Sequence, residues 1–317
     1  MAPKIFLLGA TGYIGGDVLY NLAQAHPEYE IACLARDSDK GSKVASQYAK
    51  TRLIHGNLDD DELLAKEAEK ADIVLNTSGA FIIATPDLAR KTFGEASTKI
   101  SNDWDGIEEI LSVPDWAPHR SADKLVIDGD TGTVKTAIIC PPTIYGEGRG
   151  PNNQRSHQVP EMARCVLDRK QGFRVGVGEN RMANVHVHDL SDCYLRLLEA
   201  AVEGGGKATW GKEGYYFTEN GEHAFGQVAT AIAAAAHKQS LIPSDEVATI
   251  TEKEADGLAK WGAAMWGVNF RYEAVRARKL LGWSPSAKSL DDCIATTVGI
   301  EAKRQGLVQG HAARINQ

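Results

Sequence analysis

Three glycines at positions 9, 12 and 15 follow a short apolar run and open a stretch of helical spacing. In a strand–loop–helix unit, the first two glycines of such a pattern permit a tight turn and the close approach of a pyrophosphate, and the third lets the helix pack on the strand. The start of the helix adds N–H donors and partial positive charge. The chain is therefore predicted to begin with a dinucleotide-binding unit. Its candidate cofactor-binding residues are Gly9, Thr11, Gly12, Tyr13, Ile14 and Gly15.

The first 75 residues alternate between short apolar runs and segments of helical spacing. The predicted strands are residues 4–8, 30–35, 52–55 and 71–75, and the predicted helices are 13–25, 41–49 and 59–70. Uninterrupted apolar strands in a βαβα order are typical of a parallel sheet covered on both faces. We expect an α/β fold with a doubly wound, Rossmann-type parallel sheet. Residues 1–150 are assigned to an NAD(P)-binding domain, and 151–317 to late sheet strands and a small C-terminal substrate lobe.

The later part of the chain is mixed. Strands are predicted at residues 134–140, 185–187 and 214–217, and helices at 118–130, 159–170, 190–202, 225–237 and 272–281. Asp103 and Asp105, with the pair Glu108 and Glu109, are expected at a solvated helix N-terminus, where acidic side chains complement the helix dipole.

Composition narrows the function classes. The chain has 317 residues and a net charge of −7, which disfavours nucleic acid and anionic membrane surfaces as partners. No apolar stretch approaches the roughly 18 residues of a membrane span. The five cysteines are scattered and have no CxxC spacing, which indicates reduced thiols, a cytoplasmic location and no zinc site. A small-molecule substrate is expected, and a homodimer is left open.

The end of the second predicted strand bears on the choice between NAD and NADP. An acidic residue at this place accepts hydrogen bonds from the ribose, whereas an arginine pairs with a 2′-phosphate. The strand ends Leu34-Ala35-Arg36-Asp37, so Arg36 comes first. We favour NADP on this ground, with NAD as the alternative because Asp37 is also placed to face the ribose.

Several later segments join the glycine loop in a family resemblance. They are Gly56-Asn57-Leu58-Asp59, Cys140-Pro141-Pro142-Thr143-Ile144-Tyr145-Gly146, Asn184-Val185-His186-Val187-His188-Asp189-Leu190 and Ala277-Arg278-Lys279-Leu280-Leu281-Gly282-Trp283-Ser284-Pro285. In this order they resemble an extended short-chain dehydrogenase/reductase of the NAD-dependent epimerase/dehydratase type. The sequence of the middle region is similar to that of fungal nucleoside-diphosphate-sugar epimerase-like proteins. The resemblance implies that Asn57 and Leu58 lie beside the adenine, and that Pro141 and Thr143 bind the cofactor.

The catalytic pattern of that family departs from expectation here. The family places Tyr-x-x-x-Lys on a helix, where a spacing of four brings both groups to one face. Residues 118–130 are the candidate helix, and Lys124 fits the lysine that holds the ribose. Arg120 stands at the tyrosine position, and an arginine stays protonated in proteins. His119 is the candidate base, because a histidine titrates near neutrality; a surface or helix-capping histidine is the other interpretation.

The second departure is a shortage of chain after the fourth strand. Residues 71–83 form a nearly continuous apolar run, whereas a parallel crossover needs about a dozen residues or more. We infer that one strand and its helix are missing. Ser78 is then either the family's catalytic serine, which orients the substrate oxygen, or a residue that ends the fourth strand. In the second case Asn76 and its neighbours lie near the cofactor ribose.

The resemblance also suggests a substrate cleft. Tyr145 is assigned to its wall, Arg181 to a substrate phosphate and His186 to its border, and no metal is expected. The sequence as a whole predicts an NAD(P)-dependent oxidoreductase or epimerase-like enzyme that acts on a sugar nucleotide or another small carbonyl or alcohol. A non-catalytic NAD(P)-binding sensor or regulatory protein is the alternative, which the missing tyrosine favours.

Overall fold

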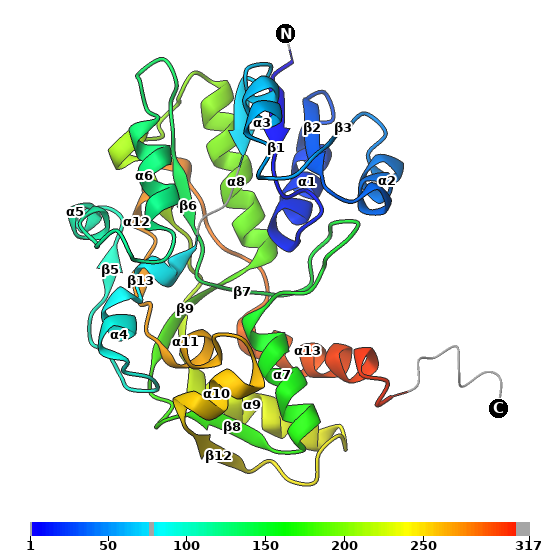
Figure 1. The fold of residues 1–317 in the computed structure, drawn as a ribbon, viewed down its shortest axis with the longest axis vertical. Helices are drawn as coiled ribbons and strands as arrows, with labels where there is room; N and C mark the ends of the chain where they lie inside the picture. Colours follow the sequence, from blue (N-terminus) through cyan, green and yellow to red (C-terminus); the bar gives the residue numbers. More distant parts are fainter. Residues whose placement is uncertain (1, 76–78, 309–317) are drawn as a thin grey trace, which may run out of the picture.

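Four parallel strands form the first sheet of the computed structural model, which describes residues 2–75 and 79–308, and their order is β3-β2-β1-β4 (Figure 1). They are β1 (Lys4–Leu7), β2 (Glu30–Ala35), β3 (Arg52–His55) and β4 (Ile73–Leu75). The helices between them are α1 (Tyr13–Ala25), α2 (Ser38–Gln47) and α3 (Asp61–Ala68). The predicted βαβα order and the parallel sheet are confirmed.

Each face of this sheet has its own apolar core. Ile5 and Leu7 of β1 pack in the main core with Leu19 of α1. Phe6, which points to the opposite face, packs with Ile54 in a second, smaller core that the α3 side covers. Successive side chains of a strand point to opposite faces, so the uninterrupted apolar run of β1 serves both cores.

A second, two-stranded sheet continues the arrangement after a break. It pairs β6 (Ile138–Cys140) with β10 (Tyr215–Phe217) in parallel. Among the described residues, β4 pairs with β1 alone and β6 with β10 alone, so no strand joins the two sheets. The segment between them holds η1 (Ala80–Ile82), α4 (Thr85–Arg90), β5 (Ser101–Asn102), α5 (Ile107–Leu111) and α6 (Arg120–Asp128). This break agrees with the inferred loss of a strand and a helix after β4.

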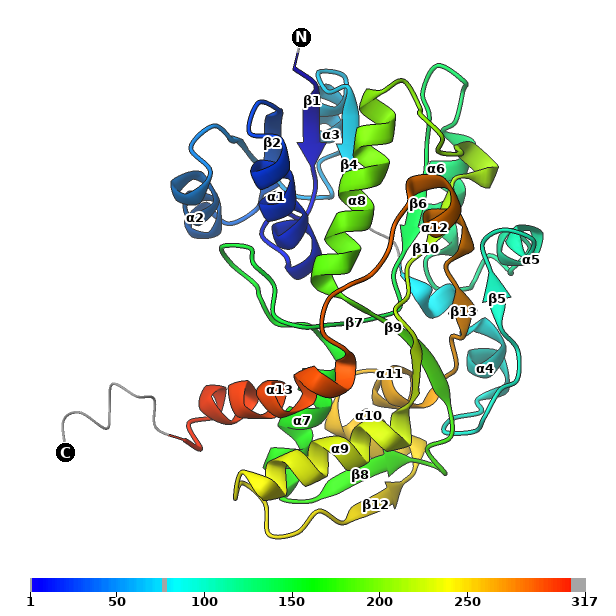
Figure 2. The same ribbon diagram turned by 180° about the vertical axis from the view of Figure 1, so that it is seen from behind.

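The remaining elements form the other half of the molecule and its junction with the first (Figures 1 and 2). A three-stranded sheet, β7 (Thr143–Tyr145), β9 (Arg181–His186) and β11 (Glu222–Ala224), lies at the junction, and β8 (Gly172–Val175) pairs with β12 (Val247–Ile250) below it. The helices of this part are α7 (Gln158–Arg169), α9 (Phe225–Lys238), α10 (Glu252–Leu258), α11 (Gly262–Gly267) and α13 (Leu290–Arg304). From β9 the chain returns to the first half through α8 (Val187–Val202), which packs beside α1. β13 (Tyr272–Glu273) pairs with β5, and α12 (Val275–Leu281) follows it.

Several local predictions differ from the structure; residues 272–273 of the predicted helix 272–281, for example, form strand β13, and the helix begins at Val275. The strand predicted over residues 134–140 begins only at Ile138, because the Asp130 carboxylate accepts hydrogen bonds from Gly132 and Thr136 and holds the preceding residues in a turn. The prediction of a solvated Asp103 is wrong, since its side chain is fully buried. Its carboxylate accepts main-chain N–H bonds from Phe217, Val275 and Arg276, at distances of 2.8 to 2.9 Å. It thereby fastens the start of α12 to the end of β10.

No helix among residues 2–75 and 79–308 combines the length and the apolar character that crossing a membrane requires.

Candidate active site

The glycine loop has the geometry that a pyrophosphate requires. Gly9 has φ +77°, a conformation that favours glycine, and its carbonyl accepts an N–H bond from Gly12 at 2.8 Å. A Cβ at Gly15 would lie inside van der Waals distance of the Gly9 carbonyl, so only glycine fits there. The N-terminus of α1 has no side-chain cap and no acidic residue in its first turn. Its N–H groups thus remain available to an anion, and Thr11 and Ile14 are partly exposed beside them.

The side chain of Tyr13, also predicted to bind the cofactor, binds the main chain of the protein instead. Its hydroxyl donates to the carbonyl of Gly146 at 2.7 Å, and burial raises the pKa of this phenol well above its usual value. The ring therefore fixes the loop after β7 against the start of α1.

Two charged residues that follow β2, Arg36 and Asp37, differ in their hydrogen bonding. The Asp37 carboxylate accepts N–H bonds from Asp39 and Lys40, at 2.9 and 3.0 Å, and so caps the N-terminus of α2. Those bonds lower the pKa of Asp37. Arg36 is exposed and has no bonding partner among the described residues. The arginine, rather than the aspartate, is therefore free to bind a ligand at this edge.

The third strand ends in a turn at the same edge. The side chain of Asn57 accepts the N–H of Asp59 at 2.6 Å, which makes the turn. Leu58 is 56% exposed, an unusual position for a large apolar side chain and one that suits contact with a flat base.

The segment that begins at Gly79 lies against the residues that follow β6. The N–H of Ala80 donates to the carbonyl of Pro141 at 3.0 Å. A Cβ on Gly79 would lie 2.9 Å from Nε2 of His119, so the imidazole lies directly against this glycine. His119 is exposed, has φ +66° and immediately precedes α6. The predicted residues Asn76 and Ser78 lie outside the described residues.

Two further residues of α6, Arg120 and Lys124, form contacts within the protein. Arg120, at the family's tyrosine position, is buried and donates to the Leu111 carbonyl at 2.5 Å. The Lys124 ammonium forms an ion pair with the exposed Asp115 carboxylate. Lys124 therefore stays a proposed cofactor residue whose charge is shared with Asp115.

Strand β7 faces inward. The hydroxyl of Thr143 is fully buried and donates to the Met182 sulfur at 3.7 Å. The Tyr145 hydroxyl donates to the Lys288 carbonyl at 2.9 Å, and burial raises its pKa well above its usual value. Both side chains thus help to fasten the junction between the two halves.

A buried carboxylate that the sequence analysis missed joins three elements near the glycine loop. Asp17 of α1 is fully buried and accepts three hydrogen bonds from Arg149, from its main-chain N–H, Nε and Nη2, at 2.7 to 3.0 Å. Ser191 of α8 donates to the same carboxylate at 2.6 Å. The available signal was an aspartate between the apolar and small residues of a helix that must pack against a sheet.

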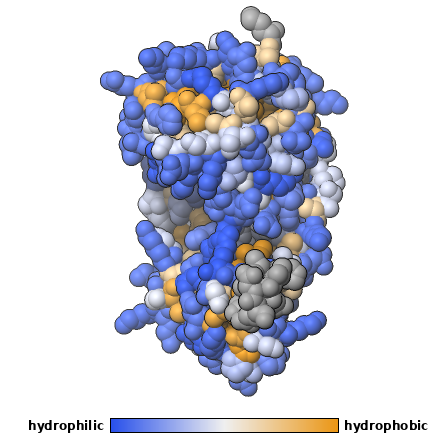
Figure 3. Space-filling view, turned by 90° about the vertical axis from the view of Figure 1, so that its right-hand side faces the viewer, coloured by the Kyte–Doolittle hydropathy of each residue, from blue (hydrophilic) through white to orange (hydrophobic). Residues whose placement is uncertain are grey.

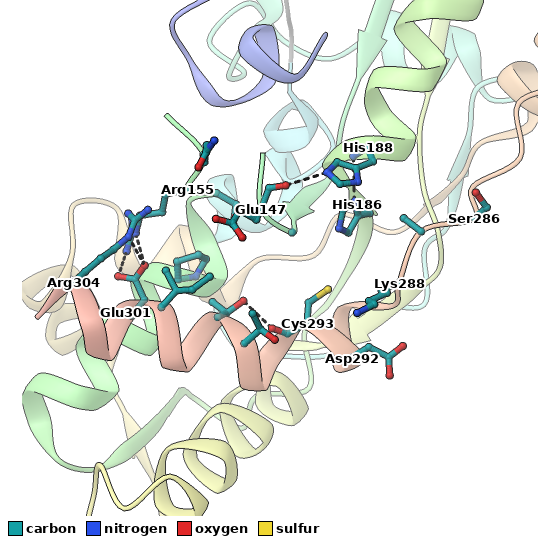
Figure 4. Close-up of a pocket in the computed structure, with 18 residues that line it drawn as sticks. Glu147, Arg155, His186, His188, Ser286, Lys288, Asp292, Cys293, Glu301 and Arg304 are labelled. Atoms are coloured by element: carbon teal, nitrogen blue, oxygen red, sulfur yellow. Dashed lines mark hydrogen bonds and ion pairs between the residues drawn. The ribbon is translucent and has the colours of Figure 1, made fainter. Parts of the chain in front are cut away.

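A cavity of about 520 Å³ lies below the loop after β7, where the molecular surface narrows between the two halves (Figures 3 and 4). His186 and His188 stand on one side, and Cys293 and Glu301 of α13 on the other. Burial lowers the pKa of His186 to about 4, so this imidazole is neutral at pH 7. Tyr145 and His186 are in edge-to-face contact, with ring centroids 5.3 Å apart.

Arg181 lies apart from these residues, at the opposite end of β9 from His186. Its guanidinium pairs with Glu222 at 3.1 Å, and Glu222 also binds Arg271. The structure therefore brings Tyr145 and His186 together but not Arg181. Among the described residues, no three His, Cys, Asp or Glu side chains are placed to hold a metal ion.

Two family models match the chain. One, described as the semialdehyde dehydrogenase NAD-binding domain, covers residues 4–92, and the other, the NAD-dependent epimerase/dehydratase family, covers residues 119–210. A protein of Acremonium sp. named oxidase ucsJ is 36% identical over 347 aligned residues, which include 97% of this chain and all of that protein. Because this chain has only 317 residues, at least 30 aligned positions, the difference between 347 and 317, face gaps in it.

Solved structures share the fold. The dTDP-glucose 4,6-dehydratase of Bacillus anthracis, in complex with NAD, has a TM-score of 0.63 and 15% identity, and the match covers 96% of this chain and 98% of that one. The UDP-glucose 4-epimerase of Thermotoga maritima, with UDP-glucose, has a TM-score of 0.62 and 15% identity over 96% of this chain and all of that one. At such identities the likeness describes the architecture, and the function depends on the site.

Proposed function

Because the chain belongs to the NAD-dependent epimerase/dehydratase family, we propose that it is an NADP-preferring oxidoreductase acting on a small carbonyl or hydroxyl compound. The observations that carry the proposal are an open glycine loop and an arginine without a partner among the described residues, which follow two neighbouring strands of the parallel sheet, and an imidazole that lies against Gly79. The loop is Gly9–Gly15, the arginine is Arg36 and the imidazole is that of His119. Ligands bind at this carboxyl edge in open α/β sheets.

The cofactor preference rests on Arg36. A planar guanidinium binds a phosphate through two hydrogen bonds, which gives both affinity and orientation. Asp37, the group that favours a free 2′-hydroxyl, is occupied by main-chain N–H groups of α2. The exposed Lys40 and Lys43 add positive charge nearby.

The proton chemistry is assigned to His119. Bound nicotinamide supplies or accepts the hydride, and a proton must then be exchanged at the substrate oxygen. The imidazole of His119 lies against Gly79, whose neighbour Ala80 donates its N–H to the carbonyl of Pro141 just after β6. A histidine side chain can serve as a general acid or base. Ser78 is proposed to orient the substrate oxygen and Lys124 the ribose, by resemblance to the family.

The names of the relatives favour redox chemistry. The Acremonium relative is named an oxidase, and a Pinus taeda protein named phenylcoumaran benzylic ether reductase is 28% identical over 34% of this chain. A sugar-nucleotide substrate is the second candidate, which the solved structures with such names favour. The pairing of Arg181 with Glu222 weighs against it, because the proposed phosphate-binding guanidinium is already neutralised.

Calorimetric titration with NADPH, and with NADH as the comparison, tests the cofactor proposal first. We expect saturable binding with a clear preference for NADPH. Oxidation of NADPH with a panel of aldehydes and ketones then tests catalysis. Binding without turnover on any of them supports the non-catalytic NADP-binding alternative. Absence of binding by either dinucleotide contradicts both functions.

A further inference from the structure

The cavity below the loop after β7 is separate from the groups assigned to the proposed reaction. Its volume of about 520 Å³ is in the range of pockets that hold small organic ligands. Among the described residues, neither the glycine loop nor Arg36, Gly79, His119 or Lys124 lines it. Its walls come from the loop after β7, the turn between β9 and α8, residues 286–288 and one side of α13 (Figure 4). A ligand in this cavity would therefore be recognised by a different set of side chains.

His186 presents an unused hydrogen-bond donor at the wall of this cavity. The residue is only 6% exposed, and its Nδ1 accepts the N–H of His188 at 3.1 Å. An accepting Nδ1 carries no hydrogen, so the hydrogen of the neutral imidazole is on Nε2. Nε2 has no hydrogen-bond partner among the described residues, and a Cβ on the lining residue Gly146 would overlap it. This N–H is suited to a ligand atom that accepts a hydrogen bond.

An ammonium group lies at the same end of the cavity. Lys288 is exposed, and its Nζ forms no hydrogen bond or ion pair with the described residues. Burial raises the pKa of the Cys293 thiol, and the nearby Lys288 ammonium opposes this shift. Figure 4 shows both side chains on the His186 side of the cavity. The neighbouring carboxylate of Asp292 accepts the hydroxyl of Ser289 at 2.7 Å, as part of the cap of α13.

The charges at the other end of the cavity are largely paired with one another. Glu301 is 3% exposed and accepts hydrogen bonds from Nε and Nη2 of Arg155, at 2.8 and 3.1 Å. Nε of Arg304 lies 3.9 Å from the same carboxylate. Figure 4 shows these three residues and Glu147 on the opposite side of the cavity from Lys288. An anionic group therefore meets the least repulsion, and the unused donors, at the Lys288 end.

We propose that this cavity binds a small organic carboxylate. One carboxylate oxygen accepts the Nε2–H of His186, and the other pairs with the Lys288 ammonium in a charge-assisted hydrogen bond. Pro160, Ala287 and Ile300, which also line the cavity, supply an apolar wall for the rest of the ligand. This inference does not depend on the proposed function.

Calorimetric titration without any dinucleotide tests the proposal, with benzoate and 3-phenylpropionate as the probes. Neither acid carries an aldehyde, ketone or alcohol group on which the proposed hydride transfer could act. Benzamide and 3-phenylpropionamide, which have the same shape and no charge, are the matched controls. We expect a dissociation constant of about 1 mM or lower for at least one acid. The corresponding amide should bind at least about tenfold more weakly, because it forms no charge-assisted bond.

The thiol of Cys293 reports on occupancy of the cavity itself. Cys293 lines the cavity and is the only cysteine among the described residues that is not buried. Its alkylation by iodoacetamide should be about tenfold slower when the acid is present at about ten times its dissociation constant. Lys288→Met should weaken binding of the acid about tenfold or more and leave binding of the amide unchanged. Lys303→Met is the matched control, since Lys303 is an exposed lysine of α13 outside the cavity.

Several outcomes overturn the proposal. Equal affinity for an acid and its amide shows that the carboxylate is not recognised. Saturable binding that leaves the alkylation of Cys293 unchanged places the acid elsewhere, and absence of binding at about 10 mM leaves the cavity without this ligand class. Equal protection of Cys293 by sodium phosphate at the same ionic strength assigns the site to any anion instead. NADPH is titrated separately into the ligand-free chain, so failure of the proposed function is distinguishable from failure of this inference.

Discussion

Arg149 binds the buried carboxylate of Asp17 through its main-chain N–H and two guanidinium nitrogens. This pair connects the loop after β7 to the helix that begins at the glycine loop. The loop after β7 and helix α1 are therefore held in one arrangement by this buried contact.

Asp17→Asn should lower the free energy of unfolding by about 3 kcal/mol, because breaking a buried ion pair leaves Arg149 without its partner. Urea unfolding at pH 7 measures this loss. Asp192→Asn is the control, since Asp192 forms a more exposed i,i+4 pair with Arg196 and should cost about 0.5 kcal/mol or less. Equal losses for the two variants contradict the role of Asp17.

The Asp17 carboxylate also predicts that the free energy of unfolding falls at acid pH. Burial opposes ionisation of Asp17, but the bonds from Arg149 and Ser191 outweigh it and lower its pKa. A lowered folded-state pKa contributes stability above the unfolded pKa, near 4, and that stability is lost as the pH falls through the folded value. Unfolding at pH 5, 4 and 3 should therefore show a steeper loss for the parent chain than for Asp17→Asn.

Two buried histidines predict a second dependence, at higher pH. Burial lowers the pKa of His186 to about 4 and that of His223 to about 3. Between these values and the unfolded pKa near 6.5 the unfolded chain binds more protons, so stability falls as the pH drops below 6.5. Each histidine contributes up to about 1.4 kcal/mol per pH unit. His223→Gln should flatten the profile between pH 6.5 and 4, and an unchanged slope contradicts the prediction.

Arg36→Asp should weaken NADPH binding by about tenfold or more, because it removes a charge-assisted bond to the 2′-phosphate and adds repulsion. NADH binding should change little. Lys50→Asp, which makes the same charge change at an exposed site past α2, is the control. Calorimetry with both dinucleotides measures the effect, and equal losses for NADPH and NADH refute the assignment.

His119→Gln should lower kcat by about 10² to 10⁴ if the imidazole transfers the proton. The affinity for NADPH should stay the same, since His119 is assigned to the substrate oxygen. Stopped-flow turnover and calorimetry separate the two quantities. A parallel loss in affinity indicates a structural effect instead.

Gly15→Ala should destabilise the chain by about 1 to 3 kcal/mol and weaken NADPH binding, because the new methyl group meets the Gly9 carbonyl. Gly257→Ala is the matched control. Gly257 lies in α10 with open space around it, so alanine should be neutral or stabilise by about 0.5 kcal/mol. Thermal unfolding of both variants provides the comparison.

Local pattern determined the nucleotide-binding half. The ranges of α1, β2 and β3 agree with prediction to the residue, because periodicity and glycine spacing act between neighbours in the chain. The shortage of residues after β4 could also be recognised from the sequence, since a parallel crossover has a minimum length. The resemblance identified the family from short segments in a fixed order.

Only the tertiary structure decided which charged side chains are free. Arg36 and Asp37 are neighbours in sequence and both are exposed, yet only Asp37 is engaged, because its carboxylate caps α2. Asp103 was expected in solvent and is buried against main-chain N–H groups more than 100 residues away. Arg181 was expected in the cleft and pairs with Glu222. The position of a buried charged group depends on the partner that replaces its hydrating water. That partner often comes from a distant part of the chain, which sequence spacing does not reveal.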